Sequence, residues 1–70
     1  MHADIINDLT IALFSCRILN IYTSDEKIII GAGGISKENI EFNSFGVVVK
    51  DIGREKWYSF YDIKKIEVYY

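Results

Sequence analysis

The sequence predicts a mainly β fold: a small, strongly bent antiparallel five-stranded barrel, or barrel-like sheet, with one N-terminal helix. Three observations lead to this prediction. After residue 17, short runs rich in β-branched and aromatic residues alternate with short polar or glycine-containing turns. Before that, the apolar side chains recur at helical spacing. The chain of 70 residues has room for a single domain, spanning 1–70, in which closure of the sheet would remove most unpaired strand edges.

The helix is predicted over residues 4–16. Its apolar stripe follows the spacing of successive helical turns and consists of Ile5, Leu9, Leu13 and Cys16. Asp4 is a suitable N-cap, because its carboxylate can accept hydrogen bonds from free amides of the first turn. A strand through Leu9–Phe14 is the alternative, because the apolar residues of that segment are also compatible with a strand.

The barrel-like sheet is predicted over residues 17–70. A hairpin is expected from strands at 16–23 and 27–30, because the polar segment 23–26 between them is typical of a turn. Residues 40–42 alternate between apolar and polar side chains before a turn at 43–44, and further strands are expected at 45–50, 56–61 and 63–70. In the last of these, alternation places Ile66, Val68 and Tyr70 on one face, and Glu67 and Tyr69 on the other.

The segment Gly31–Gly34 has three glycines in four positions, which favours a bulge or sharp bend. An anion-binding nest of backbone amides is the alternative. Phosphate-binding loop motifs do not fit, because Ser36 stands where a glycine is required. Glu38 stands where a P-loop would have its hydroxyl residue.

Composition argues against catalysis and against bound metals or cofactors. His2 is the only histidine and Cys16 the only cysteine, so no nucleophile has an adjacent base and no metal-ligand cluster is visible. The formal net charge of −2 lacks the basic excess that is usual in nucleic-acid binders. We therefore expect a non-enzymatic protein without a cofactor.

The sequence also predicts a cytoplasmic protein with no membrane association. Acidic residues stand where a signal peptide would be basic, and the apolar stretch 9–19 is interrupted by polar residues. A single unpaired cysteine suits a reducing compartment. The composition is compatible with a bacterial, archaeal or phage source.

An aromatic run at 57–61 is the strongest candidate for a ligand-binding surface. Aromatic rings beside cations are a common way to hold single-stranded nucleic acids and nucleotides. The alternative places these rings in the core, with tyrosines at its rim. The binding candidates from this region are Lys56, Trp57, Tyr61, Lys64 and Lys65.

Self-association is expected through edge strands. Tyr69 and Tyr70 end the chain on a predicted edge strand, where exposed aromatic residues favour pairing with another strand. The candidates for the oligomer interface are Val48, Tyr58, Val68, Tyr69 and Tyr70.

The order of one helix and short bent strands resembles the Sm/Hfq-like family, with the best match over residues 40–68. Phe42-Asn43-Ser44-Phe45 and the apolar strand after it resemble a turn and strand of that family, and 59–66 resembles its last segment. The resemblance implies a ring held by strand pairing between subunits. It also implies that Phe45 is a base-stacking candidate. Phe60 and Tyr61 replace the family's Lys-His pair, so the RNA site does not carry over.

The same strands are also similar to a strand pair in small bacterial PH-like domains. The leading functional hypothesis is a Sm-like binding module that oligomerises and engages RNA or a nucleotide. The alternative is a small protein-interaction module, such as a regulator or inhibitor encoded by a phage or mobile element, with no nucleic-acid role and a protein partner.

Overall fold

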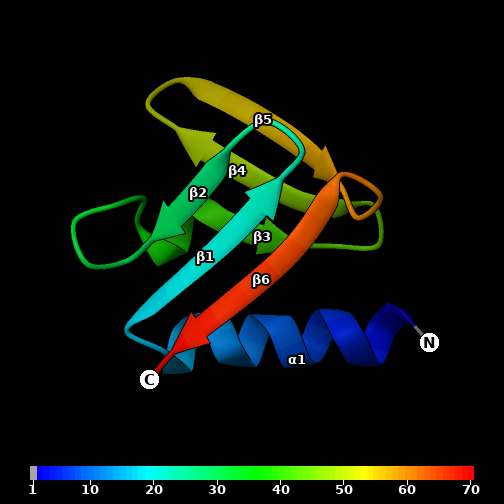
Figure 1. Cartoon of the computed structure of the whole chain (residues 1–70), viewed down its shortest axis with the longest axis horizontal. Coiled ribbons are helices and arrows are strands. Elements are labelled where there is room, and N and C mark those ends of the chain that lie inside the picture. The colour runs from blue at the N-terminus through cyan, green and yellow to red at the C-terminus, as the bar shows by residue number, and fades with distance from the viewer. Residues whose placement is uncertain (1) are drawn as a thin grey trace.

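The computed structural model describes residues 2–70 and contains one α-helix, a short 3-10 helix and six strands (Figure 1). In chain order these are α1 (His2–Ser15), β1 (Ile18–Thr23), β2 (Lys27–Ile30), η1 (Lys37–Asn39), β3 (Ile40–Phe42), β4 (Gly46–Asp51), β5 (Arg54–Ser59) and β6 (Ile63–Tyr69). The strands form two antiparallel sheets, with the orders β2-β1-β6 and β3-β4-β5.

The prediction of a mainly β chain with an N-terminal helix is confirmed, but the closed five-stranded barrel is wrong. There are six strands in two three-stranded sheets, which do not join into a barrel. The segment 31–39 separates β2 from β3, so these two strands pair with β1 and β4 in different sheets. The last strand, β6, returns to pair with β1 over its whole length instead of closing on β5.

The helix is confirmed, and the alternative strand over Leu9–Phe14 is wrong. The helix begins at His2, so Asp4 lies in its first turn and is not the predicted N-cap. Helical spacing places one stripe against the core: Leu13 is buried, and Ile6 and Leu9 pack beside it. Ile5, which the predicted stripe included, is 48% exposed. Cys16 follows directly after the helix and is also buried. The Lys37 amine donates to the Cys16 carbonyl, which satisfies an acceptor at the C-terminal end of the helix. No helix in residues 2–70 has the length and apolar character needed to cross a membrane.

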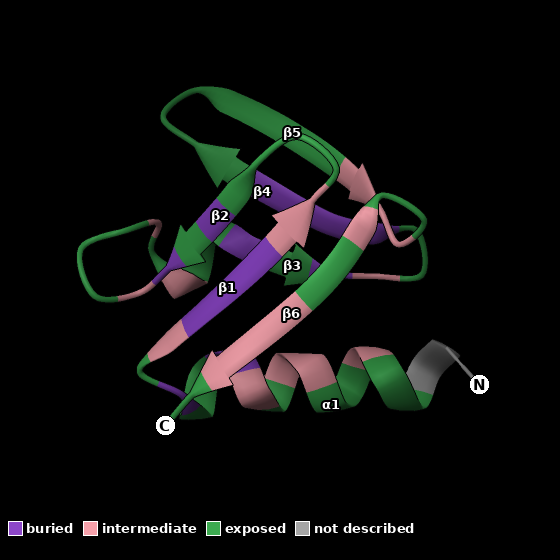
Figure 2. Cartoon of the chain, in the orientation of Figure 1, coloured by how far each residue is buried: buried purple, intermediate pink, exposed green. Residues whose placement is uncertain are grey.

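The core lies between the two sheets and is built from alternate strand residues. Figure 2 shows buried residues concentrated on β1 and β4, whereas β5 is exposed over most of its length. The expected alternation of β6 is confirmed for Ile66 and Val68, which pack against the core. The strand residues of the core are Leu19, Ile21, Ile28, Ile30, Ile40, Phe42, Val47 and Val49.

The bend predicted at Gly31–Gly34 is confirmed as a tight loop that follows β2. Gly31 has a φ of 88°, which favours glycine, and a Cβ there would lie 2.4 Å from the Arg17 carbonyl oxygen. The chain then folds back so that Ile35 forms a parallel bridge with Ile30. Within this loop, the Gly31 amide donates to the Ile35 carbonyl and the Gly34 amide donates to the Gly31 carbonyl.

Candidate functional site

Two of the predicted binding residues, Phe45 and Trp57, lie together on the outer face of the β3-β4-β5 sheet. Their ring centroids are 5.6 Å apart, at an interplanar angle of 65°, and both side chains are about half exposed. Phe45 is held by the turn before β4, where the Asn43 side-chain oxygen accepts hydrogen bonds from the amides of Phe45 (2.9 Å) and Gly46 (3.1 Å). The Trp57 indole N–H donates to Glu55 at 2.8 Å.

Two acidic residues, Glu41 and Glu55, share the sheet face of this aromatic pair with Lys50, which lies opposite Glu55 in the β4–β5 register. Glu41, Val48 and Trp57 face one another across the three strands, and Glu55 carries the Trp57 hydrogen bond. Lys56 lies next to Trp57 in sequence and therefore points to the opposite face of β5. The structure thus separates the aromatic pair from the lysine expected beside it.

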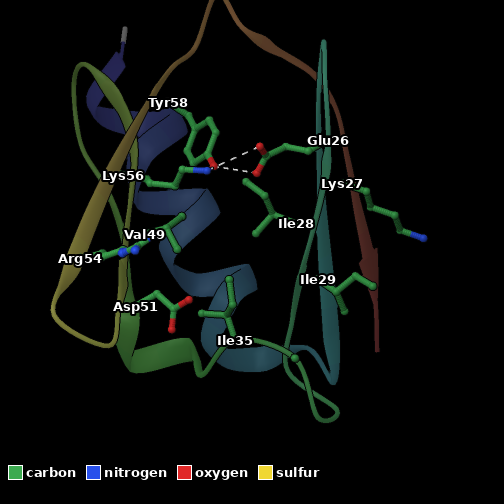
Figure 3. Close-up of a pocket in the computed structure, with 11 residues that line it drawn as sticks. Glu26, Lys27, Ile28, Ile29, Ile35, Val49, Asp51, Arg54, Lys56 and Tyr58 are labelled. Carbon is green, nitrogen blue, oxygen red and sulfur yellow. Dashed lines mark hydrogen bonds and ion pairs between the residues drawn. The ribbon is translucent and has the colours of Figure 1, made fainter.

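Lys56 instead takes part in a polar bridge between the two sheets. The Tyr58 hydroxyl donates to Glu26 at 2.7 Å, and the Lys56 amine lies 3.7 Å from the same carboxylate (Figure 3). Burial raises the pKa of the Tyr58 hydroxyl, and its hydrogen bond to Glu26 raises this pKa further. The pKa of the Lys56 amine is raised by its hydrogen bond with Tyr58 and by the nearby Glu26 charge. The bridge holds β2 against β5 where no strand pairing joins them.

Below this bridge, a cavity of about 460 Å³ opens between β2 and the inner face of β4 and β5 (Figure 3). Ile28, Ile35 and Val49 make its wall apolar. Charged side chains line the rest of it: Glu26 and Lys56 from the bridge, and Asp51 and Arg54 from the two ends of the β4–β5 turn. A volume in this range is typical of ligand sites in proteins.

Lys65 belongs to a second polar cluster, on the outer face of the β2-β1-β6 sheet. The Tyr22 hydroxyl donates to Glu67 at 2.7 Å, and the Lys65 amine lies 3.1 Å from the same carboxylate. The amines of Lys27 and Lys65 lie 5.3 Å and 5.6 Å from the centre of the Tyr22 ring. The hydrogen bond from Tyr22, then that from Lys65, lowers the pKa of Glu67 to about 2.

The lowered pKa of Glu67 predicts that the stability of the fold depends on pH. Because the folded pKa of Glu67 lies below its ordinary value of 4.5, its contribution is complete above that value. We expect the contribution to be lost progressively as the pH falls from 4.5 toward about 2. Tyr22→Phe removes the largest cause, so the Glu67 pKa measured by carbon NMR should rise and the acid dependence of urea unfolding should weaken. An unchanged Glu67 pKa in this variant would argue against the hydrogen bond.

The other predicted residues are dispersed. Lys64 is exposed on β6, and Tyr61 is 94% exposed in the turn between β5 and β6. Among the interface candidates, Val48 is 2% exposed and therefore buried within the chain, while Tyr58 and Val68 pack against the core. Tyr69 and Tyr70 are exposed, on β6 and directly after it. Tyr22, Glu26 and Glu67 were not predicted as site residues. Tyr22 and Glu67 lie on separate strands and Glu26 precedes β2, so no local sequence pattern links them.

Within residues 2–70, no group of three or more histidine, cysteine or acidic residues is placed to hold a metal ion. No family model matches the chain, and neither the curated proteins nor the solved structures show a significant match to it.

Proposed function

We propose that the chain is a non-enzymatic binding module that works as a homo-oligomer, held by main-chain pairing between the edges of β5 and β6. The observation that carries this proposal is the state of the four sheet edges. Each sheet ends in two edge strands, β2 and β6 in one and β3 and β5 in the other. An open edge presents unpaired N–H and C=O groups to another strand.

The two longest edge strands are the least covered. Ile35 occupies part of the β2 edge, and β3 has only three residues and lies beside α1. In contrast, β5 has six residues and β6 has seven, and no further strand of residues 2–70 pairs with either. Because β5 and β6 are different strands, pairing between copies is head to tail and forms a ring where the rotation closes. The Sm/Hfq-like resemblance implies the same kind of assembly.

Exposed aromatic residues on these two strands supply apolar area for such a contact. Trp57 projects from β5 and Tyr69 from β6, and both are about half exposed. Tyr70 follows β6 and is 72% exposed. Burial of aromatic surface is a strong driving force for association, and large exposed apolar groups in small proteins commonly mark interaction sites.

The edge pairing is tested by adding a charge to one strand. Tyr69→Glu should reduce the particle mass, measured by light scattering on a sizing column, to that of one chain of 8.1 kDa. The physical reason is that a carboxylate placed in a strand-to-strand contact must lose its hydration without a partner. Tyr61→Glu is the matched control, because it adds the same charge in the exposed turn and should leave the mass unchanged. An unaltered mass in Tyr69→Glu shows that β6 is not the interface.

A protein partner fits the assembled module better than RNA does. Two of the three lysines expected to contact RNA form ion pairs, Lys56 with Glu26 and Lys65 with Glu67. The aromatic pair shares its sheet face with Glu41 and Glu55, and Lys50 on that face lies opposite Glu55. Phosphate groups are attracted by cations, and this surface gives them two carboxylates beside a single lysine.

We therefore expect no saturable binding of a fluorescein-labelled, single-stranded uridine-rich RNA at physiological salt, measured by fluorescence anisotropy. RNA binding through phosphates would instead weaken steeply as the salt concentration rises. It would also be abolished when Lys64→Glu and Lys65→Glu are combined. Both results together would support RNA binding as the function instead of binding to a protein partner.

A further inference from the structure

One side of β2 has backbone groups that are free to pair with another strand. In the β1–β2 pair, the Thr23 amide donates to the Glu26 carbonyl at 2.8 Å, and Ile21 lies opposite Ile28. Antiparallel strands alternate between residues that bond to the partner and residues that point away from it. The backbone groups of Ile28 therefore face β1, and those of Lys27 and Ile29 face outward.

The loop after β2 uses only one of these outward groups. The Ile35 amide donates to the Ile29 carbonyl at 2.9 Å, and the Ile35 carbonyl accepts from Gly31 at 2.9 Å. Ile35 is the only segment of residues 2–70 that pairs with this side of β2. The Lys27 amide, the Lys27 carbonyl and the Ile29 amide remain available, which is enough for one short stretch of strand pairing.

This open edge borders the cavity between the sheets. Four consecutive residues, Glu26 to Ile29, line the cavity, as expected when a strand presents its edge. The opposite wall is the inner face of the other sheet, with Val49 and Tyr58 (Figure 3). The side chains of Lys27 and Ile29 point away from the cavity in this view, so only their backbone faces it. An added strand would hydrogen-bond to β2 and place alternate side chains against Ile28 and Val49.

We propose that this groove binds an extended segment of a partner protein, with apolar residues at alternate positions, by adding it to the edge of β2. Main-chain pairing supplies the affinity in this mode of recognition, and the pocket selects the side chains. The cavity charges are balanced, since Glu26 pairs with Lys56 and Asp51 lies opposite Arg54 in the β4–β5 register. This balance suits an uncharged apolar segment and offers no excess positive charge to a phosphate chain.

The site extends the proposed function without depending on it, because β2 is not part of the β5–β6 contact. The two failures are therefore distinguishable. A monomeric chain that still binds peptides at β2 contradicts only the assembly, and an oligomer that binds none contradicts only the groove.

A backbone substitution tests the groove directly. Lys27→Pro removes the outward N–H and places a ring on the open edge, while the bonds from Ile28 to β1 remain. Lys27→Ala is the matched control, because it removes the same side chain and keeps the N–H. A phage-displayed random heptapeptide library, selected on the wild-type protein, is the probe.

We expect enriched peptides with apolar residues at alternate positions. They should bind Lys27→Ala as tightly as the wild type, and Lys27→Pro about tenfold or more weakly. A folded Lys27→Pro is recognised by an unchanged far-ultraviolet circular dichroism spectrum. Loss of affinity in Lys27→Ala as well, or full affinity in a folded Lys27→Pro, overturns the proposal.

Amide chemical shifts locate the peptide on the wild-type protein, independently of whether the proline variant folds. Saturable changes in the amide shifts should centre on Lys27 and Ile29, and changes in the methyl shifts should centre on Val49. Shifts centred on Phe45 and Trp57 would place the peptide on the outer face of the other sheet. A library that yields no peptide with alternating apolar residues would show that the groove does not bind such a segment. Either result contradicts the groove.

Discussion

Replacing Gly46 by alanine should lower the free energy of unfolding by about 3 kcal/mol. Gly46 is the first residue of β4 and is buried opposite Ser59 of β5. A Cβ at this position would lie 1.9 Å from the Tyr58 carbonyl oxygen and 2.9 Å from the Phe60 amide nitrogen. Both are backbone atoms, so no side-chain rotation relieves the clash, and the β4–β5 pair must separate locally. Urea unfolding, followed by circular dichroism, measures the loss.

Gly53→Ala is the matched control for this effect. Gly53 lies in the β4–β5 turn with a φ of 71°, and a Cβ there would meet nothing within 4 Å. Its substitution should cost only the conformational penalty of a left-handed residue, about 1–2 kcal/mol. If Gly46→Ala costs no more than Gly53→Ala, the close approach between β4 and β5 is incorrect.

Ile21→Ala should cost about 2–5 kcal/mol, a large part of the stability expected for a domain of this size. Ile21 is fully buried at the middle of β1, where it lies opposite Ile28 of β2 and Ile66 of β6. Truncation leaves a cavity at the centre of that sheet, and the neighbouring strands relax only partly to fill it. Thermal unfolding should show a markedly lower midpoint.

The same truncation at Ile52 is the control. Ile52 is 97% exposed at the tip of the β4–β5 turn, so Ile52→Ala should change the free energy of unfolding by no more than about 0.5 kcal/mol. Similar losses at both positions would mean that the core does not lie between the two sheets.

The sequence predicts the elements of this fold well because their signals are local. Helical spacing from Ile5 to Cys16 and β-branched runs such as Val47–Val49 fix where the helix and the strands form. The pairing of strands that are far apart in the chain is a non-local property that no local pattern encodes. The pairing of β6 with β1 joins residues forty or more positions apart, as in Tyr22 with Lys65. The closed barrel was wrong for this reason.

The candidate site shows the same contrast between local contacts, which the sequence indicates, and long-range contacts, which it does not. Phe45 and Trp57 come together because a short turn and one hairpin connect them, which the sequence could indicate. Lys56 was misplaced beside Trp57 because adjacent strand residues point to opposite faces. Its partner Glu26 lies directly before β2, in the hairpin of the other sheet, and no local pattern in the sequence indicates contacts between the sheets.

The central claim, a homo-oligomer held by β5 and β6, is tested most directly by the mass of the wild-type particle. Light scattering on a sizing column should be performed over a wide range of protein concentrations. We predict one mass, a fixed multiple of 8.1 kDa, that does not change on dilution, because a closed head-to-tail ring leaves no β5 or β6 edge unpaired. A mass of 8.1 kDa at every concentration would contradict the account, since the open edges of β5 and β6 would then remain unpaired in solution.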